Sequence, residues 1–180
     1  MTHVAIVVPL KSFATGKGRL RGLAGLDVDA LSRQLAVGVI LASNPRDVYV
    51  VTESDDVENA VSPFGARVLH SPEDGLNNAV QFAFATLRPT YDFVIVAHGD
   101  LRDPTGLGSF EPGPGVTIVQ DHHGRGTPVL VVPTSSDFTF HYGADSCERH
   151  AAEARRRGLE FRIETTSPWR FDIDEPDDLK

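Results

Sequence analysis

The sequence predicts a three-layer α/β/α domain of the α/β class, built on a mostly parallel, mixed sheet. Two short apolar runs, at residues 4–8 and 93–97, are typical of strands that are buried on both faces. Segments with apolar residues three or four positions apart alternate with such runs through the first half of the chain. This alternation indicates βαβ units, in which helices cover both faces of a parallel sheet.

The first half of the chain supplies most of this pattern. After the strand at 4–8, a loop leads to a helix over 29–43, for which Asp27 or Asp29 is a suitable N-terminal cap. Asn44-Pro45 ends that helix, because the residue before a proline disfavours helical backbone. The elements expected next are a strand at 48–52, a short helix capped by Ser54, a strand at 67–70, a helix over 76–87 and a strand at 93–97.

The second half is less regular and supplies the mixed part of the sheet. The cluster at 112–115 is a turn rather than a domain linker, since a strand follows it directly. The elements expected here are strands at 116–120 and 129–132, an edge strand at 138–142, a helix over 145–157 that ends at Gly158, and a strand at 161–164. We therefore expect a single domain over residues 1–180.

Composition narrows the classes of protein that this chain can represent. Its 180 residues carry a formal net charge of −8, with 41% hydrophobic and 23% charged residues, as in ordinary soluble domains. The acidic balance argues against binding to nucleic acid or to an anionic membrane. Cys147 is the single cysteine, which excludes a disulfide framework. The N-terminal apolar run is too short to cross a membrane, so we expect a cytoplasmic protein.

The loop after the first strand has the composition of a phosphate-binding loop. It carries Lys11, Lys17 and Arg19, with glycines at positions 16 and 18. Glycine lets backbone N–H groups approach a ligand closely, and Lys and Arg complement phosphate oxygens. The loop is not a Walker loop, which needs Gly at position 11 and Ser or Thr at position 18. The alternative is a solvated basic loop without a ligand.

Acidic residues supply candidate metal ligands at two places. Asp100 follows the buried strand at 93–97 by three positions, and ligands of α/β sheets bind at such strand ends. Asp172 and Asp174 belong to an acidic cluster near the C-terminus. Mg²⁺ takes one or two carboxylates and completes its shell with phosphates and water. The alternatives are a turn or cap role for Asp100, and a capped terminal helix with a solvated face for residues 177–178.

The chain resembles the 2-phospho-L-lactate guanylyltransferase family over nearly its whole length. The matching segments are Val8-Pro9-Leu10-Lys11 with Lys17 and Arg19-Leu20, Gly75-Leu76-Asn77 before a helix, Gly99-Asp100-Leu101 after a strand, and residues 172–179. The resemblance implies a nucleotidyltransferase fold of the GT-A type. It also implies transfer of GMP from GTP to a small phosphorylated carboxylic acid (2-phospho-L-lactate, phosphoenolpyruvate or 3-phosphoglycerate) in the biosynthesis of the deazaflavin coenzyme.

The resemblance also implies roles for individual residues. The triphosphate would be stabilised by Lys11, Lys17 and Arg19, and Mg²⁺ would be held by Asp100 with Asp172 or Asp174. The implied nucleotide-binding residues are Pro9, Leu10, Gly16, Gly75 and Asn77. In the expected reaction, the acceptor phosphate attacks the α-phosphorus in line and pyrophosphate leaves. Positioning and charge neutralisation would supply the catalysis.

Three residues match the positions that surround the acceptor acid in the family, namely Thr127, Gly143 and Ser146. A hydroxyl, a close backbone N–H and a second hydroxyl can surround an anionic acid. Pro128 stands where the family has Asn, and His98-Gly99-Asp100-Leu101-Arg102 stands where it has Ala-Asp-Leu-Pro. These departures concern the acceptor site and not the nucleotidyl chemistry.

Asp145 is a further departure, because the family has a glycine there. A carboxylate inside the acceptor pocket would repel an anionic acid. Helix capping is the commoner use of Asp at such a position, and we favour it over a pocket gate. On that interpretation Asp145→Gly costs about 1 kcal/mol or less, because glycine is a tolerable cap.

Several alternatives stay open at this point. One is a related nucleotidyltransferase that uses CTP, or another phosphorylated or phosphonate acceptor. Another is a non-catalytic nucleotide-binding module of the same fold. We expect His122 and His123 to lie in a solvated loop, and Trp169 to belong to the core rather than to a base-stacking platform. The sequence also allows a homodimer.

Overall fold

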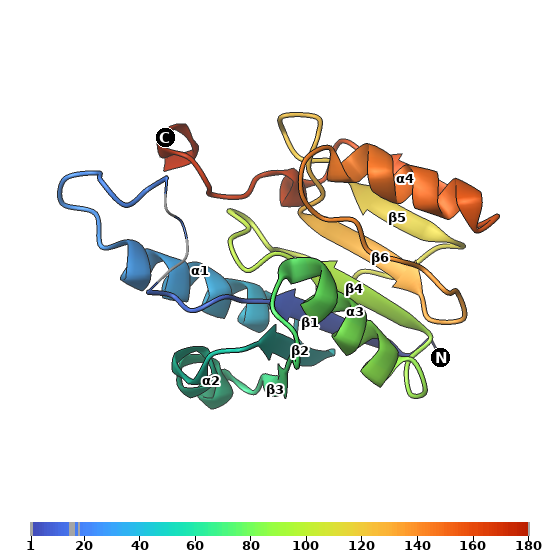
Figure 1. Cartoon of the computed structure of the whole chain (residues 1–180), viewed down its shortest axis with the longest axis horizontal. Coiled ribbons are helices and arrows are strands. Elements are labelled where there is room, and N and C mark those ends of the chain that lie inside the picture. The colour runs from blue at the N-terminus through green and yellow to red at the C-terminus, as the bar shows by residue number, and fades with distance from the viewer. Residues whose placement is uncertain (1, 15–16, 18, 180) are drawn as a thin grey trace.

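The computed structural model describes residues 2–14, 17 and 19–179. Its strands are β1 (Val4–Pro9), β2 (Asp47–Thr52), β3 (Arg67–His70), β4 (Phe93–Ala97), β5 (Val116–Val119), β6 (Val129–Pro133) and β7 (Phe161–Glu164). They form one sheet in the order β3-β2-β1-β4-β6-β5-β7 (Figure 1). Among neighbouring strands, only the pairs that include β6 are antiparallel. The predicted mostly parallel, mixed sheet is confirmed.

Helices cover both faces of this sheet. They are α1 (Val28–Ala42), α2 (Asp55–Val61), α3 (Leu76–Leu87) and α4 (Ser146–Arg156). Successive side chains of a strand point to opposite faces. Along β1, Val4, Ile6 and Val8 therefore pack in the core with α1 and α2, whereas Ala5 and Val7 pack with α3 and α4. Figure 1 shows α3 and α4 in front of the sheet.

The ends of the helices follow the local chemistry of the sequence. Asp27 caps α1 and accepts a hydrogen bond from the backbone N–H of Ala30 at 3.0 Å. Ser54 occupies the N-cap position of α2, but its hydroxyl contacts Asp56 and makes no capping bond to the backbone. Gly158 follows α4 at a φ of +66°, a left-handed conformation that glycine adopts without strain. None of the described helices has the length and apolar character that crossing a membrane requires.

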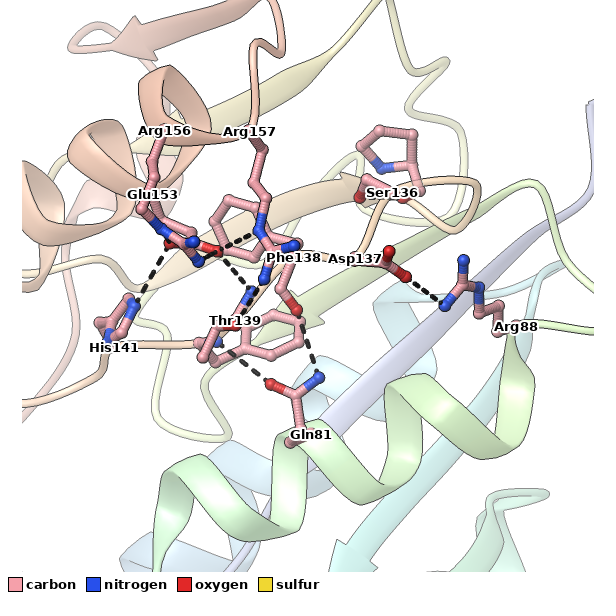
Figure 2. A network of polar contacts seen from close by, with 12 residues as sticks. Gln81, Arg88, Ser136, Asp137, Phe138, Thr139, His141, Glu153, Arg156 and Arg157 are labelled. Atoms are coloured by element: carbon pink, nitrogen blue, oxygen red, sulfur yellow. Dashed lines mark hydrogen bonds and ion pairs between the residues drawn. The ribbon is translucent and has the colours of Figure 1, made fainter.

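The edge strand expected at 138–142 is not formed. The segment lies between α3 and α4, and four successive backbone N–H groups donate to side chains of those helices. Figure 2 shows the part of this network around Gln81 and Glu153. The pairs are Thr139 with Glu153 at 3.2 Å, Phe140 with Gln81 at 3.3 Å, His141 with His150 at 3.0 Å and Tyr142 with Asn77 at 2.6 Å. Its apolar residues still alternate with polar ones and pack into the core, which explains why the sequence imitates a strand.

Glu153 fixes one end of this segment. Its side chain is 3% exposed and accepts hydrogen bonds from Arg156 at 2.7 Å and Arg157 at 2.9 Å. Burial alone would raise the pKa of Glu153, but these hydrogen bonds outweigh it and lower the pKa to about 2. A buried carboxylate that stays ionised at neutral pH therefore holds 138–142 against α4.

Candidate functional site

A pocket of about 420 Å³ opens at the carboxyl ends of β1, β2 and β4. This is the edge at which open α/β sheets bind their ligands. The pocket brings together predicted site residues from separate segments, namely Pro9, Leu10, Lys11, Lys17, Gly75, Asp100 and Asp174. Gly16 was also predicted to bind nucleotide, but it lies outside the described residues.

The C-terminal segment reaches the pocket by pairing with the chain that follows β4. The backbone N–H of Ile173 donates to the carbonyl of Asp100 at 3.0 Å, and that of Arg102 donates to Phe171 at 2.8 Å. Leu101 and Asp172 form an antiparallel bridge between these bonds. This pairing places acidic residues that are far apart in the sequence at one end of β4.

Asp178 shapes the turn that presents Asp174. One oxygen of Asp178 accepts hydrogen bonds from the backbone N–H groups of Asp174 at 2.9 Å and Glu175 at 2.7 Å. Its other oxygen lies 3.4 Å from His122 Nε2. These hydrogen bonds show that Asp178 caps a turn. Its side chain is only 10% exposed, so it does not lie on a solvated face. His122 is partly buried and stacks on Phe171, and it is therefore less solvated than expected.

Lys17 lies between the acidic residues of the site. Its ammonium is 2.8 Å from Asp100 Oδ2 and 3.6 Å from Asp174 Oδ1, and it also donates to the carbonyl of Ile173. The Lys17 side chain is 9% exposed, which strengthens these electrostatic contacts relative to a surface pair. Its backbone φ is +52°, an uncommon conformation for a residue other than glycine.

Asp100, Asp172 and Asp174 form an acidic cluster, in which the negative charges destabilise the ionised form of neighbouring carboxylates. Burial and the nearby charge of Asp100 raise the pKa of Asp172 to about 6, and the same two causes raise the pKa of Asp174. His98 Nδ1 lies 4.0 Å from Asp172 Oδ2. Among the described residues, Asp100 Oδ1 is a buried oxygen without a hydrogen-bond partner. Crowded carboxylates with an unused oxygen suit a hard divalent cation, so the donor set fits Mg²⁺.

Arg19, Asn77 and Asp172 do not line the pocket. The Arg19 guanidinium is 71% exposed and pairs with Glu175 at 2.9 Å. The amide of Asn77 makes two hydrogen bonds with the backbone of Tyr142, donating at 3.1 Å and accepting at 2.6 Å. Asn77 therefore anchors the segment between α3 and α4. The Asp172 carboxylate lies within 4.8 Å of side-chain ligand atoms of His98 and Asp100, which do line the pocket.

The predicted acceptor-binding residues form a second polar group beside α4. Thr127 Oγ1 lies 3.1 Å from Ser146 Oγ and 3.1 Å from His150 Nδ1, and all three residues are buried. His150 Nε2 accepts a hydrogen bond from the backbone N–H of His141 at 3.0 Å. In the neutral imidazole the proton is then on Nδ1, which donates to Thr127. The third predicted residue, Gly143, is exposed and precedes α4.

His150 should make the protein less stable in mild acid. Burial lowers the pKa of His150 to about 3, whereas an unfolded histidine titrates near 6.5. Below pH 6.5 the unfolded chain binds a proton that the folded protein excludes, so the free energy of unfolding falls as the pH decreases towards 3. The expected loss between pH 6.5 and pH 5 is about 1.5–2 kcal/mol.

Urea unfolding at several pH values measures this loss. His150→Gln keeps a polar side chain that does not titrate, so the variant should lack this part of the pH dependence even if it is less stable at pH 7. All other histidines are common to both proteins. If wild type and variant lose the same free energy between pH 6.5 and pH 5, His150 is not the responsible group.

Asp145 occupies the N-cap position of α4, but its side chain makes no capping hydrogen bond. Its φ of +53° is left-handed and its side chain is exposed. The expected side-chain cap is therefore wrong, and the backbone has the conformation that glycine favours.

Asp145→Gly should consequently stabilise the protein, contrary to the small cost expected from the sequence. Relief of the left-handed strain is worth about 0.5–1 kcal/mol, or a rise of a few degrees in Tm. Thermal melts of Asp145→Gly and Asp145→Ala test this, because alanine keeps the strain and should not stabilise. A lower Tm for the glycine variant would contradict the backbone explanation.

Sequence reasoning did not single out three residues, two that line the pocket and one in the polar group beside α4. Glu53 directly follows β2 and lines the pocket, and His98 directly follows β4. Their positions just beyond predicted strands were an available signal, since the carboxyl edge of the sheet was the expected site. His150 matches the histidine that ends the Phe-Gly-x-Gly-Ser-Phe-x-x-His segment of the family that the chain resembles, but its contacts with Thr127 and His141 could not be derived from that match.

A comparison with solved structures shows the fold. A solved structure from Desulfovibrio desulfuricans, described as a nucleotide-diphospho-sugar transferase, has a TM-score of 0.77 and 18% sequence identity to this chain. The match covers 99% of this chain and 85% of that one. The chain therefore has a GT-A-like fold, with its pocket at the carboxyl edge of the sheet.

Sequence similarity then shows the family. A family model described as guanylyl transferase CofC like matches residues 4–180, and the chain belongs to this family. A phosphoenolpyruvate guanylyltransferase from Conexibacter woesei is 33% identical over 187 residues, covering 96% of this chain and 84% of the relative. A 3-phospho-D-glycerate guanylyltransferase from Phenylobacterium zucineum is 32% identical over 144 residues, covering 74% of this chain and 65% of the relative. The resemblance noted from the sequence is confirmed.

Proposed function

We propose that this protein transfers GMP from GTP to a small phosphorylated carboxylic acid and releases pyrophosphate, as a step in the biosynthesis of the deazaflavin coenzyme. The observation that carries the proposal is the convergence of Lys17, Asp100 and Asp174 in the pocket at the carboxyl edge of the sheet. Membership of the guanylyl transferase family supports the same reaction. A cytoplasmic location and a homodimer stay predictions.

The reaction balances without a covalent enzyme intermediate. An oxygen of the acceptor phosphate attacks the α-phosphorus of GTP, the bond from that phosphorus to the β-phosphate oxygen breaks, and pyrophosphate leaves. Lys11 and Lys17 line the pocket and supply positive charge for the phosphates. Asp100, with Asp172 or Asp174, would hold Mg²⁺, which when bound neutralises charge on the triphosphate.

The acceptor would lie beside α4. Thr127 and Ser146 offer hydroxyls that are already hydrogen-bonded to one another, and Gly143 offers backbone close by in the chain. The relatives differ in their acceptor acid, phosphoenolpyruvate in one and 3-phospho-D-glycerate in another. We therefore propose an acceptor of this class, a three-carbon acid with one phosphate group.

A panel of nucleotides and acceptors tests the proposal. Pyrophosphate release is measured with Mg²⁺, GTP or CTP, and each of phospholactate, phosphoenolpyruvate and phosphoglycerate. We expect release with GTP and at least one of these acids. Release with CTP alone, or only with another phosphorylated or phosphonate acceptor, would indicate a related transferase. Binding of nucleotide without release under any condition would indicate a non-catalytic module.

A further inference from the structure

Glu53 lies at the opposite side of the pocket from the acidic cluster. It follows β2, whereas Asp100 follows β4, and β1 separates these two strands. Neighbouring strands are about 4.8 Å apart, so the ends of β2 and β4 are about 10 Å apart, which is close to the span from the α-phosphate of a nucleotide to the far edge of its base. A nucleotide with its phosphates at Asp100 can therefore place its base beside Glu53.

The Glu53 carboxylate is available to a ligand in the pocket. It is exposed at the pocket and makes no hydrogen bond or ion pair with the rest of the described chain. Asp100 and Asp174, in contrast, are both paired with Lys17. An unpaired carboxylate repels phosphate, so this side of the pocket suits a part of the ligand that carries hydrogen-bond donors.

Apolar side chains also form part of the wall of this pocket. Leu10, Leu76 and Ala79 line the pocket together with the end of β2. Leu10 packs directly on Gly99, where an added Cβ would lie 2.2 Å from Leu10 Cδ2. A flat aromatic base fits against such a wall, and the wall limits the access of water to hydrogen bonds at the edge of the base.

Guanine is the base whose edge matches a carboxylate. Its N1–H and 2-amino group are adjacent donors, and an ionised carboxylate accepts two hydrogen bonds side by side. Adenine presents an acceptor at N1, and hypoxanthine lacks the 2-amino group. We propose that Glu53 is the specificity-determining residue for guanine, accepting hydrogen bonds from N1–H and from the 2-amino group. This inference rests on the proposed function, in which GTP is the nucleotide.

Equilibrium binding of GTP, ITP and ATP in the presence of Mg²⁺ tests this role without the acceptor. Wild type should bind GTP about tenfold or more tightly than ITP, which lacks the 2-amino donor, and should bind ATP more weakly still. Glu53→Gln replaces one acceptor oxygen by an amide donor. The variant should therefore lose about tenfold in affinity for GTP but little for ITP, because its remaining oxygen still accepts from N1–H.

Glu73→Gln is the matched control, since Glu73 is exposed and does not line the pocket. It removes the same charge and should keep the preference for GTP over ITP. Equal affinity of wild type for GTP and ITP would overturn the inference, and so would a folded Glu53→Gln protein with an unchanged preference. Absence of GMP transfer despite guanine-selective binding would instead overturn the proposed function alone.

Discussion

Asp100→Asn should lower the rate of GMP transfer by about 100-fold or more. One oxygen of Asp100 contacts Lys17 at 2.8 Å, and the other is buried and has no partner in the described chain. Whichever way the asparagine amide is turned, an N–H donor replaces one of these two oxygens, so the variant loses either the lysine contact or a ligand for the cation. The rate is measured as pyrophosphate release at saturating Mg²⁺, GTP and acceptor.

Two further measurements separate this effect from a general loss of structure. The thermal midpoint of Asp100→Asn should stay close to that of wild type, because the substitution also removes repulsion from Asp172 and Asp174. The rise in midpoint caused by Mg²⁺ with GTP should be smaller in the variant. Asp103→Asn, at an exposed turn of the same loop, should behave as wild type. Turnover of Asp100→Asn near the wild-type rate would rule out Asp100 as a cation ligand.

The sheet was predictable from the sequence because its central strands have a distinctive apolar pattern. β1 and β4 are buried on both faces, so they are uninterrupted apolar runs, which only a few structures can accommodate. The helices carry apolar residues at helical spacing, and local signals mark two of their ends, with Asp27 at the start of α1 and Gly158 just after α4. Each of these signals is local, and the structure places the elements within a few residues of the predicted ranges.

The segment at 138–142 was predicted wrongly because its hydrogen-bond partners are remote. Alternation of apolar and polar residues indicates that one face of a segment is buried. It does not indicate which groups accept the hydrogen bonds of its backbone N–H groups. Here Asn77 and Gln81, which lie 65 and 59 positions away, accept from Tyr142 and Phe140. No spacing within the segment reveals these contacts.

Only those parts of the candidate site that directly follow predicted strands could be placed from the sequence. Asp100 and Lys17 lie at the carboxyl edge because they follow β4 and β1, and this position is implied by the order of elements. The approach of Asp174 depends instead on antiparallel pairing between the chain after β4 and the C-terminal segment. The acidic composition of the C-terminal segment made Asp172 and Asp174 candidate ligands, but it is also typical of a solvated terminus, and the resemblance to a family favoured the site.

Lys17→Met should weaken the binding of GTP about 10- to 100-fold and reduce its dependence on salt. The ammonium is nearly buried at the pocket, so its attraction for phosphate is screened less than that of an exposed lysine. Methionine keeps a similar apolar stem and removes only the charge and its donors. The dissociation constant of GTP with Mg²⁺ is measured at several salt concentrations, and the variant should show a shallower slope.

A purely structural role for Lys17 predicts a different result. The ammonium joins Asp100 to Ile173 and Asp174, so its removal leaves neighbouring carboxylates without a compensating charge and should lower the thermal midpoint in either case. Affinity for GTP separates the two roles, because a tether alone has no contact with phosphate. Arg88→Gln removes one cation from an exposed pair with Asp137 between α3 and the 138–142 segment and should leave GTP binding unchanged (Figure 2). A destabilised Lys17→Met protein that binds GTP as tightly as wild type at low salt would show that Lys17 only holds the C-terminal segment in place.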